Sequence, residues 1–222
     1  MVMDTNTSPD HLLPNGVILS EDGQPRCTWA ANVPSFLDYH DSEWGFPVDD
    51  DHKLFEKLCL ESFQSGLSWR TILDKRPAFR AVFLDFDFEK VARFNDSDVQ
   101  RLLKNARIVR HRGKIEATIN NAQRACEIVE TYGSLGAFIW RYEPPVVKMT
   151  NAVRMTVTQT EYSVRLAKDL KKLGWRFFGP TTAYAFMQAM GLVNDHMLGC
   201  FVHARCESAR ASFRRPNSTN IG

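Results

Sequence analysis

The chain has 222 residues, of which 44% are hydrophobic and 24% charged, and its formal net charge is +2. This composition is typical of one globular domain and excludes collagen, a coiled coil and wholesale disorder. No apolar run reaches the roughly 18 residues needed to span a bilayer, and no basic-then-apolar leader opens the sequence, so we expect no membrane partner and a cytoplasmic location. The five cysteines, an odd and scattered set, argue against a disulfide framework.

The two ends of the chain differ in composition from its middle. Residues 1–26 are polar and punctuated by proline and glycine, which predicts a flexible N-terminal arm. Residues 27–205 carry the pattern of a helical domain. Residues 206–222 are rich in serine, arginine and asparagine, and we expect this basic tail to be disordered. We expect the protein to be a monomer.

Between the tails the dominant hydrophobic period is helical. In chain order the pattern predicts helices over 53–63, after Ser97, over 114–129 with Gly133 as the stop, after Ser134, after Ser163 with Gly174 as the stop, and after Thr181 or Thr182 with Gly191 as an interruption. Alternating β patterns are rare and short. The predicted fold class is therefore all-α, with about seven or eight short helices.

Two pairs of possible metal ligands lie far apart in the sequence. His196 and Cys200 are four residues apart, a spacing that on a helix brings both side chains to one face. With Cys27 and His40 they offer the two thiolates and two imidazoles of a closed tetrahedral zinc site, which would be structural because no coordination position stays open. On spacing alone, buried apolar cysteines are an equally good interpretation. Two residues with i, i+3 spacing are competing ligands: His203 and Cys206.

A basic segment lies between the second and third predicted helices. Five cations with no acid among them fall within eleven residues: Lys104, Arg107, Arg110, Arg112 and Lys114. A short turn before a helix exposes backbone N–H groups that favour a phosphate, and the cations add a sequence-independent attraction to a nucleic-acid backbone. A solvated charged face is an equally good interpretation of these cations. Gly113 is the one glycine of the turn, so the segment does not fully match the pattern of a glycine-rich hairpin.

Glu61 falls on the apolar stripe of Leu54 and Leu58, where a carboxylate is unfavourable unless it has partners. Aromatic residues flank it in the sequence: Trp29, Phe36, Tyr39, Trp44 and Trp69. Flat rings with one acceptor suit a flat, electron-poor ligand. From these residues alone, an aromatic core with Glu61 paired to an arginine is the stronger interpretation. The pair Gly66-Leu67 is either a small apolar wedge for a gap in a base stack or an ordinary turn.

Five stretches, taken in order, resemble the DNA-3-methyladenine glycosylase type I family. They are Cys27-Thr-Trp29, Tyr39-His40-Asp-Ser-Glu-Trp44-Gly45, Leu60-Glu61-Ser-Phe-Gln64-Ser-Gly66-Leu67-Ser-Trp69, the stretch from Ile108 to Ile115, and the stretch from Phe186 to Cys200. They cover about residues 27–200. Any one stretch is moderately specific, whereas five in the family's order are strongly specific.

The resemblance implies a helix-hairpin-helix DNA glycosylase with two helical lobes and one structural zinc ion joining the N- and C-terminal segments. The implied reaction is hydrolysis of the N-glycosidic bond of 3-methyladenine in alkylated double-stranded DNA, which releases the free base and leaves an abasic site. The implied zinc ligands are Cys27, His40, His196 and Cys200. The implied base-binding residues are Phe36, Tyr39, Trp44, Glu61 and Trp69, with Glu61 the base-recognising and candidate catalytic carboxylate. The implied DNA contacts are Gly66, Leu67, Arg107, Arg110, Arg112, Gly113 and Lys114.

The sequence departs from the family pattern at two of these positions. Phe36 stands where the family often has tyrosine, so one pocket hydroxyl is missing, and Arg107 stands where some members have glycine. Two other functions stay open: a module that grips DNA without chemistry, which gives Glu61 no role, and a glycosylase for alkylated guanine or an oxidised base. A metal-dependent hydrolase is weaker, because four protein ligands saturate zinc.

Overall fold

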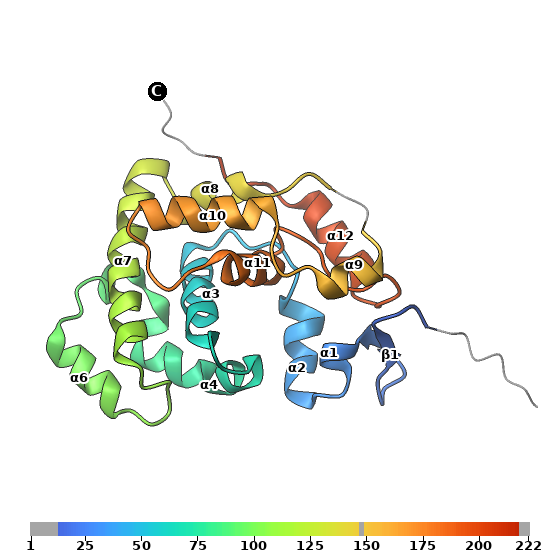
Figure 1. Cartoon of the computed structure of the whole chain (residues 1–222), viewed down its shortest axis with the longest axis horizontal. Coiled ribbons are helices and arrows are strands. Elements are labelled where there is room, and N and C mark those ends of the chain that lie inside the picture. Colours follow the sequence, from blue (N-terminus) through green and yellow to red (C-terminus); the bar gives the residue numbers. More distant parts are fainter. Residues whose placement is uncertain (1–12, 147–148, 218–222) are drawn as a thin grey trace, which may run out of the picture.

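The structure is a computed structural model that describes residues 13–146 and 149–217 (Figure 1). The first half of the chain forms β1 (Val17–Leu19), β2 (Pro25–Cys27), α1 (Thr28–Ala31), α2 (Pro34–Asp38), the π-helix η1 (Tyr39–Glu43), α3 (Asp51–Gln64), α4 (Trp69–Val82), the 3-10 helix η2 (Leu84–Phe86), α5 (Phe88–Val91) and α6 (Asp96–Lys104). The second half forms α7 (Arg112–Tyr132), α8 (Leu135–Ile139), the 3-10 helix η3 (Trp140–Tyr142), α9 (Asn151–Thr156), α10 (Glu161–Lys172), α11 (Pro180–Ala189) and α12 (His203–Ser212).

The prediction of a mostly helical protein is confirmed, with one small antiparallel sheet of β1 and β2 added to it. Among the described helices, none combines the length and the apolarity that crossing a membrane requires.

Both ends of the chain are more ordered than the sequence indicated. Residues 13–26 were expected in a flexible arm, but β1 and β2 pair there as a hairpin, with Val17 opposite Cys27. Buried Val17 packs against Cys27, and buried Arg26 forms an ion pair with Asp22. The expected disordered tail is likewise wrong over 206–212, because α12 extends to Ser212 and buries Cys206. Residues 1–12 and 218–222 of the two predicted tails lie outside the described residues.

Helices α6 and α10 begin at capping side chains. Both caps lie two or three residues before the ones that the sequence predicted. The side chain of Asn95, not Ser97, caps α6, because it accepts a hydrogen bond from the Ser97 amide. Thr160 caps α10 in the same way and leaves Ser163 inside the helix. The stop at Gly133 is confirmed, since this residue adopts a left-handed φ of 86° after α7.

Helix α3 lies in the middle of the main hydrophobic core. All its side chains from Leu54 to Phe63 are buried, and α4, α7, α8 and α11 pack against it (Figure 1). A second, smaller buried cluster forms where the N-terminal hairpin meets the segment before α12: Val17, Cys27, Met197, Cys200, Val202 and Cys206. Residues from opposite ends of the chain therefore share one small core.

The turn after α11 brings the C-terminal segment onto the N-terminal one. Gly191 has a φ of 76°, and a Cβ atom at this position would lie 2.5 Å from the carbonyl carbon of Phe46. Only glycine allows this approach, because the contact is with backbone that cannot move aside. Correcting the helical expectation, His196 and Cys200 lie in a non-helical segment, where a turn brings Cys200 back toward Met197.

Candidate active site and metal centre

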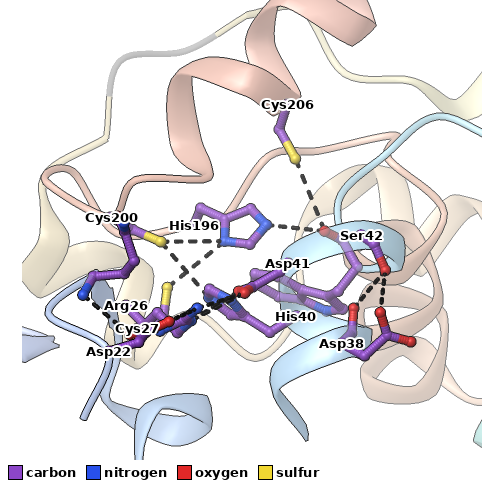
Figure 2. A network of polar contacts seen from close by, with 12 residues as sticks. Asp22, Arg26, Cys27, Asp38, His40, Asp41, Ser42, His196, Cys200 and Cys206 are labelled. Carbon is purple, nitrogen blue, oxygen red and sulfur yellow. Dashed lines mark hydrogen bonds and ion pairs between the residues drawn. The ribbon is translucent and has the colours of Figure 1, made fainter. Parts of the chain in front are cut away.

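Four residues from the two ends of the chain converge on one buried point (Figure 2). The ligand atoms of Cys27, His40, His196 and Cys200 all lie within 4.8 Å of one another. The Sγ atom of Cys200 lies 3.7 Å from Nε2 of His40 and 3.8 Å from Nδ1 of His196, and Sγ of Cys27 lies 3.8 Å from the same Nδ1. This cluster could hold a metal ion.

Each histidine of the cluster is oriented by a hydrogen bond on its other ring nitrogen. Nδ1 of His40 pairs with Oδ1 of Asp41 at 2.7 Å, and Asp41 in turn accepts from the buried guanidinium of Arg26. Nε2 of His196 donates to the carbonyl oxygen of Trp44 at 2.9 Å, which leaves Nδ1 facing the cluster as an acceptor. Such outer partners are typical of metal-binding histidines.

The two sulfur atoms of the cluster are coupled. The contact between the two thiols holds the pKa of Cys200 well below its usual range, while the same contact and burial raise the pKa of Cys27. One sulfur is therefore readily ionised, which is the form that binds a metal. The competing ligands lie apart from the cluster: Cys206 lies 3.9 Å from the Trp44 carbonyl oxygen, and His203 lines a different cavity.

A cavity of about 460 Å³ is lined by most of the predicted base-binding residues. Its aromatic wall consists of Trp29, Tyr39, Trp44 and Trp69, and Glu61 lies among them. The rings of Tyr39 and Trp69 have centroids 5.4 Å apart, while those of Trp29 and Trp44 are 5.0 Å apart. Phe36 does not line this cavity; it packs against Trp29, with ring centroids 5.9 Å apart.

Glu61 is only 5% exposed, and its charged partner is Lys57, one helical turn earlier on α3. The Nζ atom of Lys57 lies 3.6 Å from Oε1 of Glu61 and donates a hydrogen bond of 2.6 Å to the Tyr39 hydroxyl. Burial raises the pKa of Glu61, and the ammonium of Lys57 opposes that rise; burial also lowers the pKa of Lys57 to about 8. The sequence-based alternative of an arginine partner is wrong, because it is this lysine that pairs with Glu61.

The lining of the cavity also includes a second carboxylate, Asp195. Asp195 accepts hydrogen bonds from the Tyr184 hydroxyl at 2.5 Å and from Nε2 of Gln188 at 2.9 Å, and it pairs with Arg154 at 3.3 Å. These contacts saturate Asp195, whereas among the described residues Glu61 forms its ion pair with Lys57. Asp195 lies next to His196 in a matched stretch and could have been noticed there, but nothing in the sequence pointed to Arg154.

The predicted wedge is the turn between α3 and α4. Gly66 has a φ of 82° with open space around its Cα, and Leu67 beside it is 40% exposed. The flanking residues Gln64 and Trp69 line the cavity, so the wedge lies at its edge. Ser68 caps α4, a helix that the sequence did not indicate.

The predicted DNA-contacting cations divide into two groups. Arg107, Arg110 and Arg112 are exposed on the turn between α6 and α7, and Arg112 forms an ion pair of 3.1 Å with Glu116. Lys114 is buried instead. Its ammonium donates to the carbonyl oxygens of Phe63 at 2.9 Å and Ser65 at 2.5 Å, at the end of α3. Gly113 lies half-buried at the start of α7, whose N-terminus is capped by the side chain of His111.

A helical protein with a ring-lined cavity, a buried carboxylate, an apolar turn at the cavity edge and an exposed basic turn has the features of an enzyme that holds one nucleobase outside its duplex. Comparison with known proteins gives the class. The methyladenine glycosylase family model matches residues 29–203, and the chain belongs to this family. The family predicted from the five sequence stretches is thereby confirmed.

Relatives cover most of the chain. It is 46% identical to DNA-3-methyladenine glycosylase 1 of Escherichia coli over 177 residues, 79% of this chain and 95% of the relative. It is 44% identical to DNA-3-methyladenine glycosylase of Haemophilus influenzae, over 79% of this chain and 96% of the relative. A crystal structure of 3-methyladenine DNA glycosylase I matches with a TM-score of 0.76 and 46% identity, over 80% of this chain and 99% of the other. A structure of the Staphylococcus aureus enzyme matches with a TM-score of 0.76 and 39% identity, over 80% of this chain and 96% of the other.

Proposed function

We propose that this protein excises 3-methyladenine from alkylated double-stranded DNA by hydrolysing the N-glycosidic bond, which releases the free base and leaves an abasic site. The observation that carries the proposal is the buried carboxylate of Glu61 in the wall of a cavity lined by the rings of Tyr39, Trp44 and Trp69. A structure of the S. aureus relative was solved for the structural basis of 3-methyladenine recognition, which supports the same ligand here.

Two further structures of relatives support the assignment of Tyr39 and Glu61. One is a Tyr→Phe variant in complex with 3-methyladenine, and the other is a Glu→Gln variant. The two altered positions are 22 residues apart in those chains, and the same separation joins Tyr39 to Glu61. The match supports these two residues as the tyrosine and the carboxylate of the base pocket.

The chemistry of the lesion explains why a cavity of this kind is sufficient. Methylation at N3 gives the adenine a positive charge, so the base is already a good leaving group and selection becomes the main task. Contact with the aromatic faces contributes about 0.5–2 kcal/mol in favour of a cationic base. A hydrogen bond from the base to ionised Glu61 adds about 1.5–3 kcal/mol. Neutral adenine gains neither of these charge-dependent contributions in full.

Glu61 serves recognition first and stabilisation of the reacting sugar second. As water attacks C1′ and the base departs, positive charge develops on the sugar, and the Glu61 carboxylate and the DNA phosphates both stabilise that charge. The proposed reaction forms no covalent lysine intermediate. We assign no separate general base, since Asp195 is fully engaged by Tyr184, Gln188 and Arg154.

The DNA would be held by the two turns beside the cavity. In the proposed complex Leu67, presented by Gly66, fills the gap left by the extruded base. The turn between α6 and α7 is proposed as a helix-hairpin-helix element whose exposed Arg107, Arg110 and Arg112 contact phosphates. All parts of the site come from one chain, which supports action as a monomer.

We propose that Cys27, His40, His196 and Cys200 bind one structural zinc ion. Two thiols and two imidazoles within 4.8 Å fit a closed tetrahedral site, and hydrogen bonds to Asp41 and Trp44 orient the histidines. The ion would supply cross-linking and no catalysis. Linking residues 160 to 169 positions apart would stabilise the fold by about 4–5 kcal/mol, by analogy with a disulfide that closes a long loop.

Release of free base from methylated duplex DNA tests this function. The protein is incubated with methylated and unmethylated duplexes, and the released bases are separated by chromatography. We expect 3-methyladenine from the methylated duplex alone and inhibition by added free 3-methyladenine. DNA binding without any released base would favour the binding module, and release of alkylated guanine or an oxidised base in its place would favour a different lesion.

A further inference from the structure

A buried lysine next to a pocket for a cation is unexpected, because two positive charges in one apolar site repel each other. Lys57 is only 5% exposed, and its Nζ atom lies 4.4 Å from the ring centroid of Tyr39 and 4.0 Å from that of Trp69. Tyr39, Trp69 and Glu61 line the cavity, whereas Lys57 does not. The ammonium therefore contacts the same rings and carboxylate as an incoming base, but from outside the cavity.

We propose that Lys57 is a positioning residue for base recognition: its ammonium is the counter-charge that keeps Glu61 ionised, and its hydrogen bond fixes Tyr39 against Trp69. The inference rests on the proposed function and adds to it the device that prepares the carboxylate. It assigns Lys57 no contact with the base or with the reacting sugar.

The ion pairs around the cavity single out Lys57 for this role. The nearby cations of α4 are already paired with other carboxylates: Arg76 with Glu43 at 2.5 Å and Arg80 with Glu56 at 2.9 Å. Across the cavity Arg154 pairs with Asp195. Among the residues that the structure describes, Lys57 is the cation that ion-pairs with Glu61.

The charges that face this pair come from four elements and largely cancel. They are Tyr39 and Glu43 of η1, Glu56 of α3, Arg76 and Arg80 of α4, and Arg154 of α9 with Asp195 beyond it. Glu43, Glu56 and Asp195 are each neutralised by an arginine, so the charge state of Glu61 depends mainly on Lys57. Burial alone would favour a protonated, uncharged Glu61, which could not attract a cationic base.

The dependence of base release on pH tests this role. Lys57→Met removes the ammonium, Lys57→Arg keeps a cation, and Lys53→Met is the matched control, since Lys53 is exposed one turn earlier on the same helix. For Lys57→Met we expect the acid limb of the pH profile of kcat/KM to move to higher pH by at least one unit. Activity at pH 7 should fall and should recover toward the wild-type value at pH 9. Lys57→Arg and Lys53→Met should have the acid limb at the same pH as the wild-type protein.

An equal loss of activity at all pH values, with the acid limb unmoved, would overturn the proposal and leave Lys57 a merely structural residue. Urea unfolding of the same variants gives a readout that does not depend on catalysis. Without Lys57, folding raises the pKa of Glu61 further, so the stability deficit should be largest at pH 8 and shrink as the pH falls to about 4 and below, where the carboxyl becomes protonated in both states. A deficit independent of pH would also contradict the role of Lys57. If the wild-type protein released no base, the proposed function would fail. The pH dependence of urea unfolding would still show whether Lys57 is the counter-charge of Glu61.

Discussion

Oδ1 of Asp41 lies 2.7 Å from Nδ1 of His40, the residue immediately before it, and thereby sets which ring nitrogen of the histidine faces the cluster of two cysteines and two histidines. Arg26 holds the same carboxylate from the other side, with Nη2 2.8 Å from Oδ2 of Asp41. The N-terminal hairpin, through Arg26, therefore helps to orient His40, which lies three elements further along the chain.

Asp41→Asn should weaken metal retention by roughly 10- to 100-fold, because the amide removes the charge that orients and polarises His40. Competition with a chromogenic chelator measures the loss. Asp38→Asn is the control, since Asp38 is exposed on the preceding helix and accepts a hydrogen bond from Ser42. Equal chelator sensitivity of the two variants would contradict the proposed support by Asp41. Metal analysis of the wild-type protein should first give about one zinc ion per chain.

Glu61→Gln should lower the rate of 3-methyladenine release roughly 10- to 150-fold, as expected from losing a charge-assisted hydrogen bond of about 1.5–3 kcal/mol. Binding to undamaged DNA should stay within a factor of two, because Glu61 is buried away from the phosphate-facing turns. Glu56→Gln makes the same change on the same helix, where the carboxylate pairs with Arg80, and should leave release largely intact. Unchanged release by Glu61→Gln would remove this carboxylate from the mechanism.

Arg110→Ala should weaken binding to every DNA sequence alike. It should also make the slope of log K against log salt about 0.9 smaller in magnitude, because one phosphate contact is lost. Fluorescence anisotropy between about 50 and 200 mM salt measures the slope. Arg165→Ala on α10 removes an exposed arginine far along the chain and should leave the slope unchanged. Identical slopes for wild type and Arg110→Ala would exclude this turn as a phosphate site.

Lys114→Met should behave differently from the exposed arginines. Its ammonium holds the carbonyl oxygens of Phe63 and Ser65, so its loss loosens the turn that carries Leu67. We expect slower base release with an unchanged salt slope, measured in the same two assays. A smaller slope would show that Lys114 contacts phosphate after all, as the sequence had indicated.

Gly191→Ala should destabilise the fold by about 2–5 kcal/mol, since left-handed strain adds to a clash of the new Cβ with backbone. Gly23→Ala is the matched control, with a φ of 77° but nothing within 4 Å of the added carbon, and should cost only about 1–2 kcal/mol. Urea unfolding of both variants measures the difference. Equal losses would mean that the approach to Phe46 is not a tight constraint.

The sequence predicted the parts of this molecule that depend on local periodicity or on ordered motifs. The helix around Glu61 and the stop at Gly133 are examples, because helical spacing and glycine at a left-handed position are visible locally. The grouping of Cys27 with Cys200 was suggested by residue type, and the structure brings these residues together.

The remainder depends on contacts between distant segments, which spacing does not reveal. Nothing in the sequence singled out Lys57, which is buried against the rings of Tyr39 and Trp69 from other parts of the chain. Lys114 looked like a phosphate ligand, because the end of α3 that it caps lies about 50 residues earlier. The hairpin at 17–27 was hidden by polar residues whose partner, Asp41, comes later in the chain.

The convergence of Cys27 and His40 with His196 and Cys200 also has a consequence for biosynthesis. The cluster needs residues from two distant segments, so it cannot assemble before Cys200 has been synthesised. The cavity shares this late closure, because its lining includes Tyr39, next to His40, and Asp195, next to His196. A chain truncated before Asp195 would therefore lack half of the cluster and part of the cavity lining.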